Sequence, residues 1–485
     1  MKYHSTRNAS LRRTASQAIL QGISEEGGLF VPQEIPQVDL ASLQGLDYCA
    51  LAAKLLGLYL TDYSADFLLR AARQAYGPQR FGGAAAKTVK LEQGLYSLEL
   101  WHGPTSAFKD YALQLMPLLL VEAKRINRDD GRTAILVATS GDTGKAALEG
   151  YKDLPGVEIA VFYPDHGTSE IQRLQMATQE GANVHVFAVS GNFDDAQTGV
   201  KRVFTDAAFA AECAAQGKHL TSANSINWGR LAPQIIYYFA SYLDLVRTGE
   251  LRLGDALDFC VPTGNFGDIL AGYYARRMGL PVRRLICASN RNKVLTDFGA
   301  SGVYDANRPF YKTASPSMDI LVSSNLERLL YHESGDDALV AQLMGALAQN
   351  KKYQVPGSLQ DRIAEVFTFG CTEEERCFAE IAATWEKDHY LADPHTAVAL
   401  SAARVQADGK TPCVVLSTAN PYKFSGAVLA ALGGSVQADD FANLDALEQL
   451  TGTAAPAALR ALRQKPVRFE ATIRPEEIPA AARAL

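Results

Sequence analysis

From about Val137 to Leu432, short apolar runs rich in valine and isoleucine alternate with longer amphipathic segments. Each run is followed by a turn and a helix candidate, which is typical of successive βαβ units. Such units place parallel strands side by side, because the crossover helix returns the chain to the same end of the sheet. The pattern therefore predicts an α/β fold with open parallel sheets. The expected strands are residues 134–138, 158–162, 183–187, 257–261, 285–288 and 412–416.

A chain of 485 residues exceeds what one hydrophobic core usually supports, so two or three domains are expected. The first part of the chain has helix candidates at 50–59 and 65–76 but few strand signals. We predict a mostly helical N-terminal domain, a small α/β domain that includes the lysine helix described below, and a large α/β domain. Their expected ranges are residues 1–98, 99–230 and 231–485, with an inserted helical segment at about 301–395 and an extended tail from Gln464.

Composition excludes several classes of partner. The net charge of -6 is small for this length, so no basic surface is available for nucleic acid or an anionic membrane. The first residues lack the apolar core of a signal peptide, and no run approaches the ~20 apolar residues of a membrane helix. We therefore expect a cytoplasmic enzyme with neither nucleic acid nor a membrane as partner.

Cysteine and histidine give no sign of a metal. The seven cysteines include no Cys-x-x-Cys pair, and the eight histidines have no metal-binding spacing. We predict neither a disulfide framework nor a metal requirement. A monovalent cation held by backbone carbonyl oxygens would leave no signal in the sequence.

Lys109 lies in the run His102–Asp110, where turn-forming residues give way to a helical pattern. Pro104 and Thr105 suggest a helix start, which would place Lys109 in the first turn. The positive end of the helix dipole and partial burial both disfavour an ammonium there, so they lower its pKa. Such a lysine suits Schiff-base chemistry. On position alone, an ordinary exposed lysine near a helix end fits better.

A glycine-rich turn follows the expected strand at 134–138 and opens a helix. Its N–H groups and hydroxyls can donate to a carboxylate or phosphate. A nucleotide P-loop is disfavoured, because that motif needs glycine where Thr139 stands and serine or threonine where Ala146 stands. The candidate binding residues in this turn are Ser140, Gly141, Asp142 and Thr143.

Two further turns follow strands in the second half of the chain. The turn after the expected strand 257–261 lacks the Gly-x-Gly-x-x-Gly of dinucleotide sites and fits a compact phosphate cup. The turn after the expected strand 412–416 carries Thr418. Each turn taken alone could also be an ordinary connection between a strand and a helix in an α/β fold. Because ligands of open α/β sheets bind at the carboxyl ends of strands, all three turns would face one crevice. A phosphate cup, a carboxylate loop and a reactive lysine together indicate pyridoxal phosphate. The cup residues are Gly264, Asn265, Phe266 and Gly267.

The chain resembles the threonine synthases, pyridoxal-phosphate enzymes of the tryptophan-synthase-β-like fold, and in particular their longer bacterial and fungal members. That fold places the cofactor in a cleft between two open parallel-sheet domains. The resemblance extends over nearly the whole chain. It rests on residues 2–7, 25–32, 102–110, 139–144, 191–195, 224–230, 262–267, 315–320, 323–328 and 393–396.

The resemblance implies a role for each candidate. Lys109 would form the Schiff base with pyridoxal phosphate and shuttle protons, and the cup would hold the cofactor phosphate. Thr418 would hydrogen-bond the pyridine nitrogen, and the 140–143 turn would hold the substrate α-carboxylate. The implied reaction converts O-phospho-L-homoserine and water to L-threonine and phosphate. The groups implied to bind the substrate phosphate are Thr143, Asn224, Ser225 and Arg230.

Asp142 departs from the wider fold, in which many members have an asparagine that donates to the cofactor's phenolic oxygen. An ionised aspartate cannot donate, so Asp142 is either protonated or contacts an ammonium, a lysine or water. An aspartate at this position is similar to what the longer threonine synthases have. Two other functions stay open: a phospho-lyase that releases 2-oxobutyrate, and an inactive homologue that binds a phosphate ligand. We expect a monomer or weak homodimer.

Overall fold

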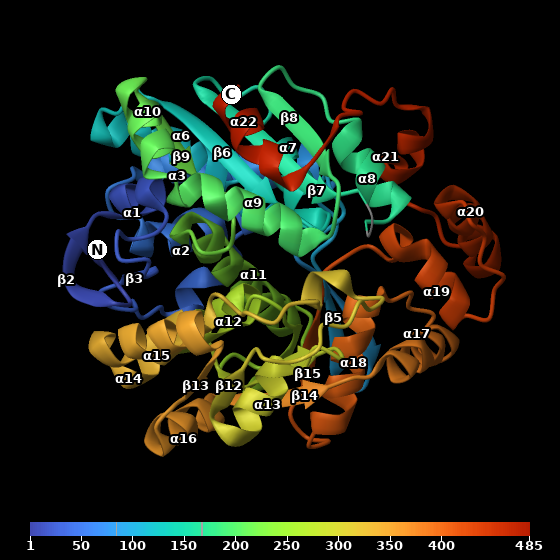
Figure 1. Ribbon diagram of the computed structural model, residues 1–485. Helices are drawn as coiled ribbons and strands as arrows, with labels where there is room; N and C mark the ends of the chain where they lie inside the picture. The colour runs from blue at the N-terminus through green and yellow to red at the C-terminus, as the bar shows by residue number, and fades with distance from the viewer. Residues whose placement is uncertain (84, 166–167) are drawn as a thin grey trace.

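The computed structural model describes residues 1–83, 85–165 and 168–485. Two α/β regions lie one above the other in Figure 1, with the N-terminal elements against both of them at the left. The strands predicted from the apolar runs are all present, as are the two N-terminal helices. The α/β class with open sheets is therefore confirmed.

The larger sheet has six strands in the order β14-β11-β10-β15-β5-β4. Neighbouring strands are parallel except for the β4–β5 hairpin, which places an antiparallel strand at one edge. β10 and β15 are buried along their whole length, so helices must cover both faces of the sheet. The strands are β4 (Lys87–Glu92), β5 (Leu95–Glu99), β10 (Leu257–Pro262), β11 (Val282–Ser289), β14 (Phe367–Cys371) and β15 (Cys413–Ser417).

Helices from both halves of the chain cover this sheet. α18 packs on β10, β11 and β15, and α12 packs on β10 and β11. The apolar residues of these helices face the strands, which builds the core of the lower region in Figure 1. The helices of this region are α11 (Trp228–Arg247), α12 (Gly267–Arg277), α13 (Val294–Ser301), α16 (Gly357–Val366), α17 (Glu374–Asp388), α18 (Pro394–Gln406), α19 (Ser425–Ala431), α20 (Asp440–Thr451) and α21 (Ala457–Arg460).

The smaller sheet has five parallel strands in the order β16-β8-β7-β6-β9. α7 and α9 pack on its central strands. The strands are β6 (Arg132–Ala138), β7 (Val157–Pro164), β8 (Val184–Val189), β9 (Lys218–Thr221) and β16 (Thr472–Ile473). The helices are α5 (Asp110–Leu113), α6 (Met116–Asn127), α7 (Asp142–Tyr151), α8 (Glu170–Ala177), α9 (Phe193–Thr205), α10 (Ala207–Ala215) and α22 (Ile478–Arg483).

The N-terminal region forms a small antiparallel sheet followed by helices. α1 begins at a capping box made by Thr14 and Gln17 and packs on α6, whereas α2 packs on α3 and α11. This region therefore contacts both α/β regions. Its elements are β1 (Tyr3–Ser5), β2 (Asn8–Arg13), α1 (Ala15–Gln21), β3 (Phe30–Pro32), α2 (Tyr48–Tyr59), α3 (Ala65–Tyr76) and α4 (Pro78–Phe81).

Two expectations need correction. The segment 301–395 is not only helical: besides α14 (Leu326–Ser334) and α15 (Asp337–Asn350), it holds the hairpin β12 (Val303–Asp305)–β13 (Lys352–Gln354) and the sheet strand β14. β14 is only five residues long, and Thr368 and Gly370 interrupt its apolar residues, so its apolar run is weak. The tail is not merely an extended wrap, because β16 joins β8 and α22 packs on α9.

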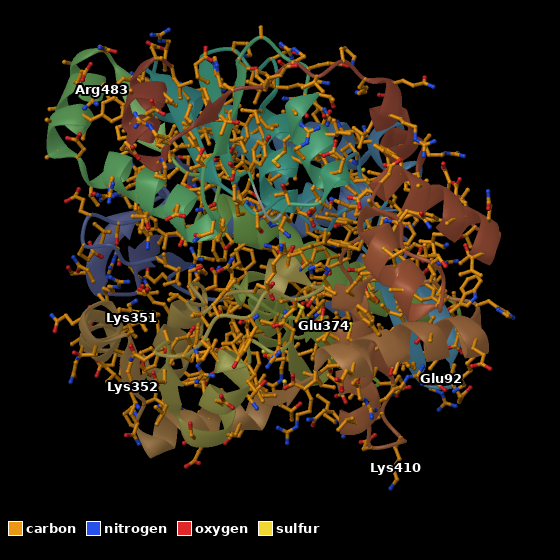
Figure 2. All side chains as sticks on the ribbon, turned by 45° about the vertical axis from the view of Figure 1, so that its right-hand side comes forward. Glu92, Lys351, Lys352, Glu374, Lys410 and Arg483 are labelled. Atoms are coloured by element: carbon orange, nitrogen blue, oxygen red, sulfur yellow. The ribbon has the colours of Figure 1, made fainter. Side chains whose placement is uncertain are left out.

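The three domain boundaries stay predictions. Sheet pairing links segments across them: the β4–β5 hairpin joins β15, and β16 joins the smaller sheet. Within the described residues, no helix combines the length and apolar character needed to span a membrane. Charged side chains such as Lys410 and Arg483 extend from the periphery in Figure 2.

Candidate active site

The loop that carries Lys109 is joined by backbone hydrogen bonds to the loop that carries Thr418. The Phe108 N–H donates to the Thr418 carbonyl at 2.8 Å, and the Asn420 N–H donates to the Ser106 carbonyl at 3.1 Å. A β-bridge pairs the residues between them. The two loops follow β5 and β15, which are neighbouring parallel strands. Strand adjacency thus brings Lys109 and Thr418 to the same edge of the sheet.

Lys109 is the residue before α5 and does not lie in a helical first turn, so the predicted helix start at Pro104 and Thr105 is wrong. Ser106 has a φ of 60°, which a right-handed helix cannot accommodate. The loop is instead fixed by Asp110, whose carboxylate accepts from the Thr105 N–H at 2.8 Å and the Thr105 hydroxyl at 2.9 Å.

Burial lowers the pKa of Lys109 to about 8. Asp142 and Asp268 oppose this effect, whereas the positive charges of Lys423 and Arg230 add to it. The side chain is half-buried and its Nζ lies 4.5 Å from the centroid of the Phe108 ring. A substantial fraction of Lys109 is therefore a free amine near neutral pH, as nucleophilic and basic roles require.

We expect the labelling of Lys109 by an amine-specific acylating reagent to rise with a midpoint near pH 8 in the cofactor-free chain. Mass spectrometry of the labelled peptide measures it, with exposed Lys410 as the reference for reagent reactivity. The pKa of Lys109 is about 8 in the folded chain and about 10.4 in an unfolded one. The resulting contribution of Lys109 to folding stability is therefore complete above about pH 10.4 and is lost as the pH falls through 8. A midpoint above pH 10 would contradict the environment described here.

The glycine-rich cup follows β10 and opens α12. Phe266 has a φ of 62°, and within the described residues no acceptor pairs with the backbone N–H groups of residues 264–267. Gly264 must stay small, because an added Cβ would lie 2.8 Å from the Ser317 carbonyl. Unpaired N–H groups at the start of an eleven-residue helix form an anion site.

Residues of the 315–328 segment hold the cup in place by hydrogen bonds to its carbonyl groups. The Ser323 hydroxyl donates to the Gly264 carbonyl at 2.8 Å, and the Asn325 N–H donates to the Asn265 carbonyl at 3.0 Å. The Asn325 amide also donates to the Ser225 hydroxyl at 3.2 Å. The segment expected to be an insertion therefore shapes the site.

The turn 140–143 also has unpaired donors. Thr139 organises it, since its hydroxyl accepts from the N–H groups of Gly141 and Gly144 at 3.0 Å each. Within the described chain, the N–H groups of Ser140, Asp142 and Thr143 have no acceptor. Gly141 has a φ of 150°, and an added Cβ would contact the Gln172 side chain.

Arg230 is buried in the first turn of α11 and donates to the Ala223 carbonyl. Its Nε has no partner, and no carboxylate pairs with it among the described residues. Burial lowers its pKa to about 10, so it remains charged at neutral pH. An uncompensated buried guanidinium is costly, which indicates that an anion completes the site.

Two charged residues near Lys109 were missed by the sequence reasoning. Lys423, in the 3-10 turn Pro421–Phe424 after β15, pairs with Asp142. Asp268 follows the cup and accepts from the hydroxyls of Tyr237 and Tyr238 at 2.5 and 3.1 Å. Burial raises the pKa of Asp268 to about 6. Only the position of Lys423 after Asn420-Pro421 and of Asp268 after Gly267 could have pointed to them.

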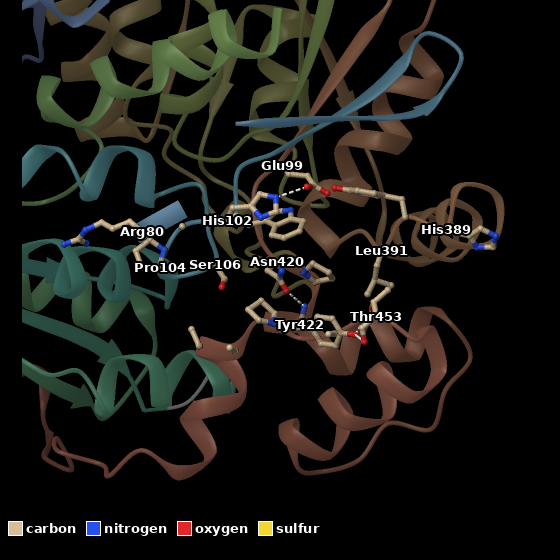
Figure 3. Close-up of a pocket in the computed structure, with 18 residues that line it drawn as sticks. Arg80, Glu99, His102, Pro104, Ser106, His389, Leu391, Asn420, Tyr422 and Thr453 are labelled. Carbon is tan, nitrogen blue, oxygen red and sulfur yellow. Dashed lines mark hydrogen bonds and ion pairs between the residues drawn. The ribbon is translucent and has the colours of Figure 1, made fainter. Parts of the chain in front are cut away.

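Figure 3 shows a cavity of about 530 Å³ beside the Lys109 loop. His102 points toward Glu99 there, with 2.7 Å between the ring Nε2 and the carboxylate. Ser106 and Asn420 line its wall, but none of the predicted site residues does. In the described part of the chain no cluster of metal-ligating side chains is found.

Family models match most of the chain. Residues 2–76 match the threonine synthase N terminus, residues 83–358 the pyridoxal-phosphate-dependent enzymes, and residues 396–477 the C-terminal region of threonine synthase. Threonine synthase of Pseudomonas aeruginosa is 40% identical over 436 residues, which cover 88% of this chain and 90% of that protein. The chain belongs to the threonine synthase family.

Other relatives agree with this membership. Threonine synthase-like 1 of Homo sapiens is 40% identical over 432 residues; the match covers 86% of this chain, and the chain spans 58% of that protein's length. The pyridoxal-phosphate-bound threonine synthase structure from Brucella melitensis has a TM-score of 0.89 and 37% identity, and covers 100% of this chain and 99% of the other. This threonine synthase family member thus shares the architecture over its whole length.

The residues present fit pyridoxal phosphate. The unpaired N–H groups of the cup suit a phosphate dianion, and Lys109 is a lysine with a depressed pKa at the same edge of the sheet. Thr418 is buried in the loop bonded to that of Lys109 and can offer a hydroxyl. The chain therefore offers a lysine amine, an anion-binding turn and a buried hydroxyl at one edge of the larger sheet.

Proposed function

We propose that this chain catalyses the conversion of O-phospho-L-homoserine and water to L-threonine and phosphate. The observation that carries the proposal is Arg230, a buried guanidinium without a carboxylate partner among the described residues, which lies close enough to Lys109 for their charges to interact. A planar guanidinium suits a phosphate dianion. A substrate with its own phosphate group would supply the missing anion.

The cofactor is assigned to the edge of the larger sheet. We propose that Lys109 binds pyridoxal phosphate covalently, that the N–H groups of Gly264, Asn265, Phe266 and Gly267 hold its phosphate, and that Thr418 faces its ring nitrogen. When bound, pyridoxal phosphate would act as an electron sink for the negative charge left at the substrate Cα.

The substrate has two anionic ends and needs two sets of donors. We assign its α-carboxylate to the N–H groups and hydroxyls of the turn Ser140, Gly141, Asp142 and Thr143. Its phosphate is assigned to Arg230 with Asn224, Ser225 and Thr143. The carboxylate set includes the start of α7, where the N–H groups of Asp142 and Thr143 are unpaired among the described residues, which favours an anion. In the phosphate set, Arg230 lies in the first turn of α11.

Lys109 would serve as the proton carrier. The reaction removes a proton from Cα and one from Cβ, releases phosphate from Cγ, returns a proton to Cγ, adds the hydroxyl of water at Cβ, and returns a proton to Cα. An amine with a pKa of about 8 is suited to both taking and giving these protons near neutral pH. Early escape of the intermediate would give 2-oxobutyrate, so the site must close around one water.

Product analysis tests the proposal. The purified holoenzyme with O-phospho-L-homoserine should release threonine and phosphate in equal amounts, measured by amino-acid chromatography and a phosphate assay. Phosphate with 2-oxobutyrate and ammonia would establish a phospho-lyase instead. Phosphate-ligand binding without any turnover would establish an inactive homologue.

The assembly and compartment belong to the same proposal. A monomer or weak homodimer in the cytoplasm is consistent with the moderate charge and the absence, among the described residues, of a helix suited to a bilayer. Sedimentation of the holoenzyme measures the assembly, and a stable tetramer would contradict it.

A further inference from the structure

A buried ion pair joins the turn at 140–143 to the loop after β15. The Lys423 Nζ lies 2.6 Å from the Asp142 Oδ1, and the two side chains are 0% and 2% exposed. Gln172 donates to the same carboxylate oxygen at 2.9 Å, and Lys423 also donates to the Thr105 carbonyl at 3.1 Å. The pair therefore connects α7, α8 and the Lys109 loop.

Asp142 is held ionised by this environment. Burial alone would raise the pKa of Asp142, but Lys423 and Lys109 together hold it well below its usual range. This answers the question that the aspartate raised, because Asp142 contacts an ammonium. Within the described residues no direct ion pair joins Asp142 to Lys109, so those two charges act on each other at longer range.

Lys109 faces both charges of the pair. The carboxylate favours its ammonium form and the Lys423 ammonium disfavours it. The pair is neutral as a whole, so the two effects oppose each other. The other charged groups that face these three residues are Asp110 at the start of α5, Arg230 on α11 and Asp268 on α12.

We propose that Asp142 and Lys423 act as one charge-balanced unit beside Lys109, in which Lys423 is a positioning residue that keeps Asp142 ionised and fixed. A carboxylate at this depth needs an oppositely charged partner, whereas an asparagine needs only hydrogen bonds. The aspartate and the lysine are then coupled choices: either both charges are present or both are absent. The proposal rests on the proposed function only in taking Lys109 as the reactive lysine.

Three variants test the coupling: Lys423→Met, Asp142→Asn and the double variant. The readout is the pH midpoint of Lys109 labelling in the full-length, cofactor-free chain. Lys423→Met should raise the midpoint by about one pH unit, because a like charge is lost and the freed carboxylate can attract Lys109. Asp142→Asn should lower it by about one unit, because only the repulsion remains. The double variant should return close to the wild type.

Thermal unfolding provides the second readout. Lys423→Met should lower the unfolding midpoint because it leaves a buried carboxylate without its ammonium, and the double variant should recover most of that loss. Lys145→Met is the matched control, since Lys145 lies on the same helix and pairs with Glu149 at 3.2 Å. It should lower stability without moving the Lys109 midpoint.

Specific outcomes overturn the proposal. Single variants that shift the labelling midpoint in the same direction would do so, as would a double variant that behaves like either single one. A loss of stability in Lys423→Met with an unchanged midpoint would reduce the pair to a structural link. If Lys423→Met does not fold, Asp142→Asn and the double variant still decide through their midpoints. Labelling does not depend on threonine formation, so this proposal and the proposed function can fail separately.

Discussion

Replacing Lys109 by alanine is expected to lower turnover of O-phospho-L-homoserine on the order of 10⁴-fold or more, since general acid–base catalysis alone contributes about 10²–10⁴-fold and the covalent attachment is lost as well. The absorption band of lysine-bound pyridoxal phosphate should disappear at the same time. The change removes a half-buried side chain at a loop, so the fold should persist. Turnover is measured as phosphate release and the band by absorption spectroscopy.

The control for this variant is Lys145→Ala. Lys145 also has a largely buried side chain, but its ammonium pairs with Glu149 and Gln179. It should keep the absorption band and most of the turnover. An active Lys109→Ala variant that retains the band would remove Lys109 from the chemistry and leave the assigned cofactor site without its anchor.

The strands β6, β7, β8, β10, β11 and β15 were predictable because their short apolar runs are rich in β-branched residues. The strands β4, β5, β9, β14 and β16 were not predicted from the sequence. β6 and β10 are buried along nearly their whole length and are apolar at most positions, as strands covered on both faces usually are. The turns at their carboxyl ends were predictable for the same reason, because the glycines and hydroxyl residues follow directly. Parallel topology then places each of those turns at the carboxyl edge of its own sheet without any further information.

The local structure around Lys109 was less predictable. The apolar spacing from Phe108 to Leu119 is helical, but pairing with the 418–420 loop overrides it, and α5 is only four residues long. A proline and a threonine that suggested a helix start belong to the turn before it. Tertiary hydrogen bonds between segments far apart in the chain carry no signal in a single sequence.

The partners of the buried charged residues could not be predicted from the sequence either. Asp142 could be recognised as unusual, but Lys423 lies in another part of the chain, and no periodicity joins the two. Asp268 directly follows the cup in the sequence, but its two tyrosine partners come from α11. Motifs identify groups that bind ligands, whereas the groups that set their charge are supplied by packing.

Arg230 gives the second large effect. Arg230→Met should raise KM for O-phospho-L-homoserine about 100-fold or more, because truncating one partner of a buried, hydrogen-bonded charge pair costs about 2–5 kcal/mol. The KM of Arg230→Lys should lie between those of the wild type and Arg230→Met, since lysine keeps the charge and loses the planar guanidinium. Steady-state kinetics on the three proteins measures the series, and the absorption band should remain in all of them.

Stability separates this role from a structural one. In the substrate-free chain the guanidinium is buried without a carboxylate partner among the described residues, so it contributes a desolvation cost. Arg230→Met should therefore leave the unfolding midpoint unchanged or raise it while binding of the phosphorylated substrate weakens. A residue that mainly supports the fold would show the opposite: a lower unfolding midpoint with little change in KM. That result would remove Arg230 from the phosphate site, and with it the observation on which the proposed substrate rests.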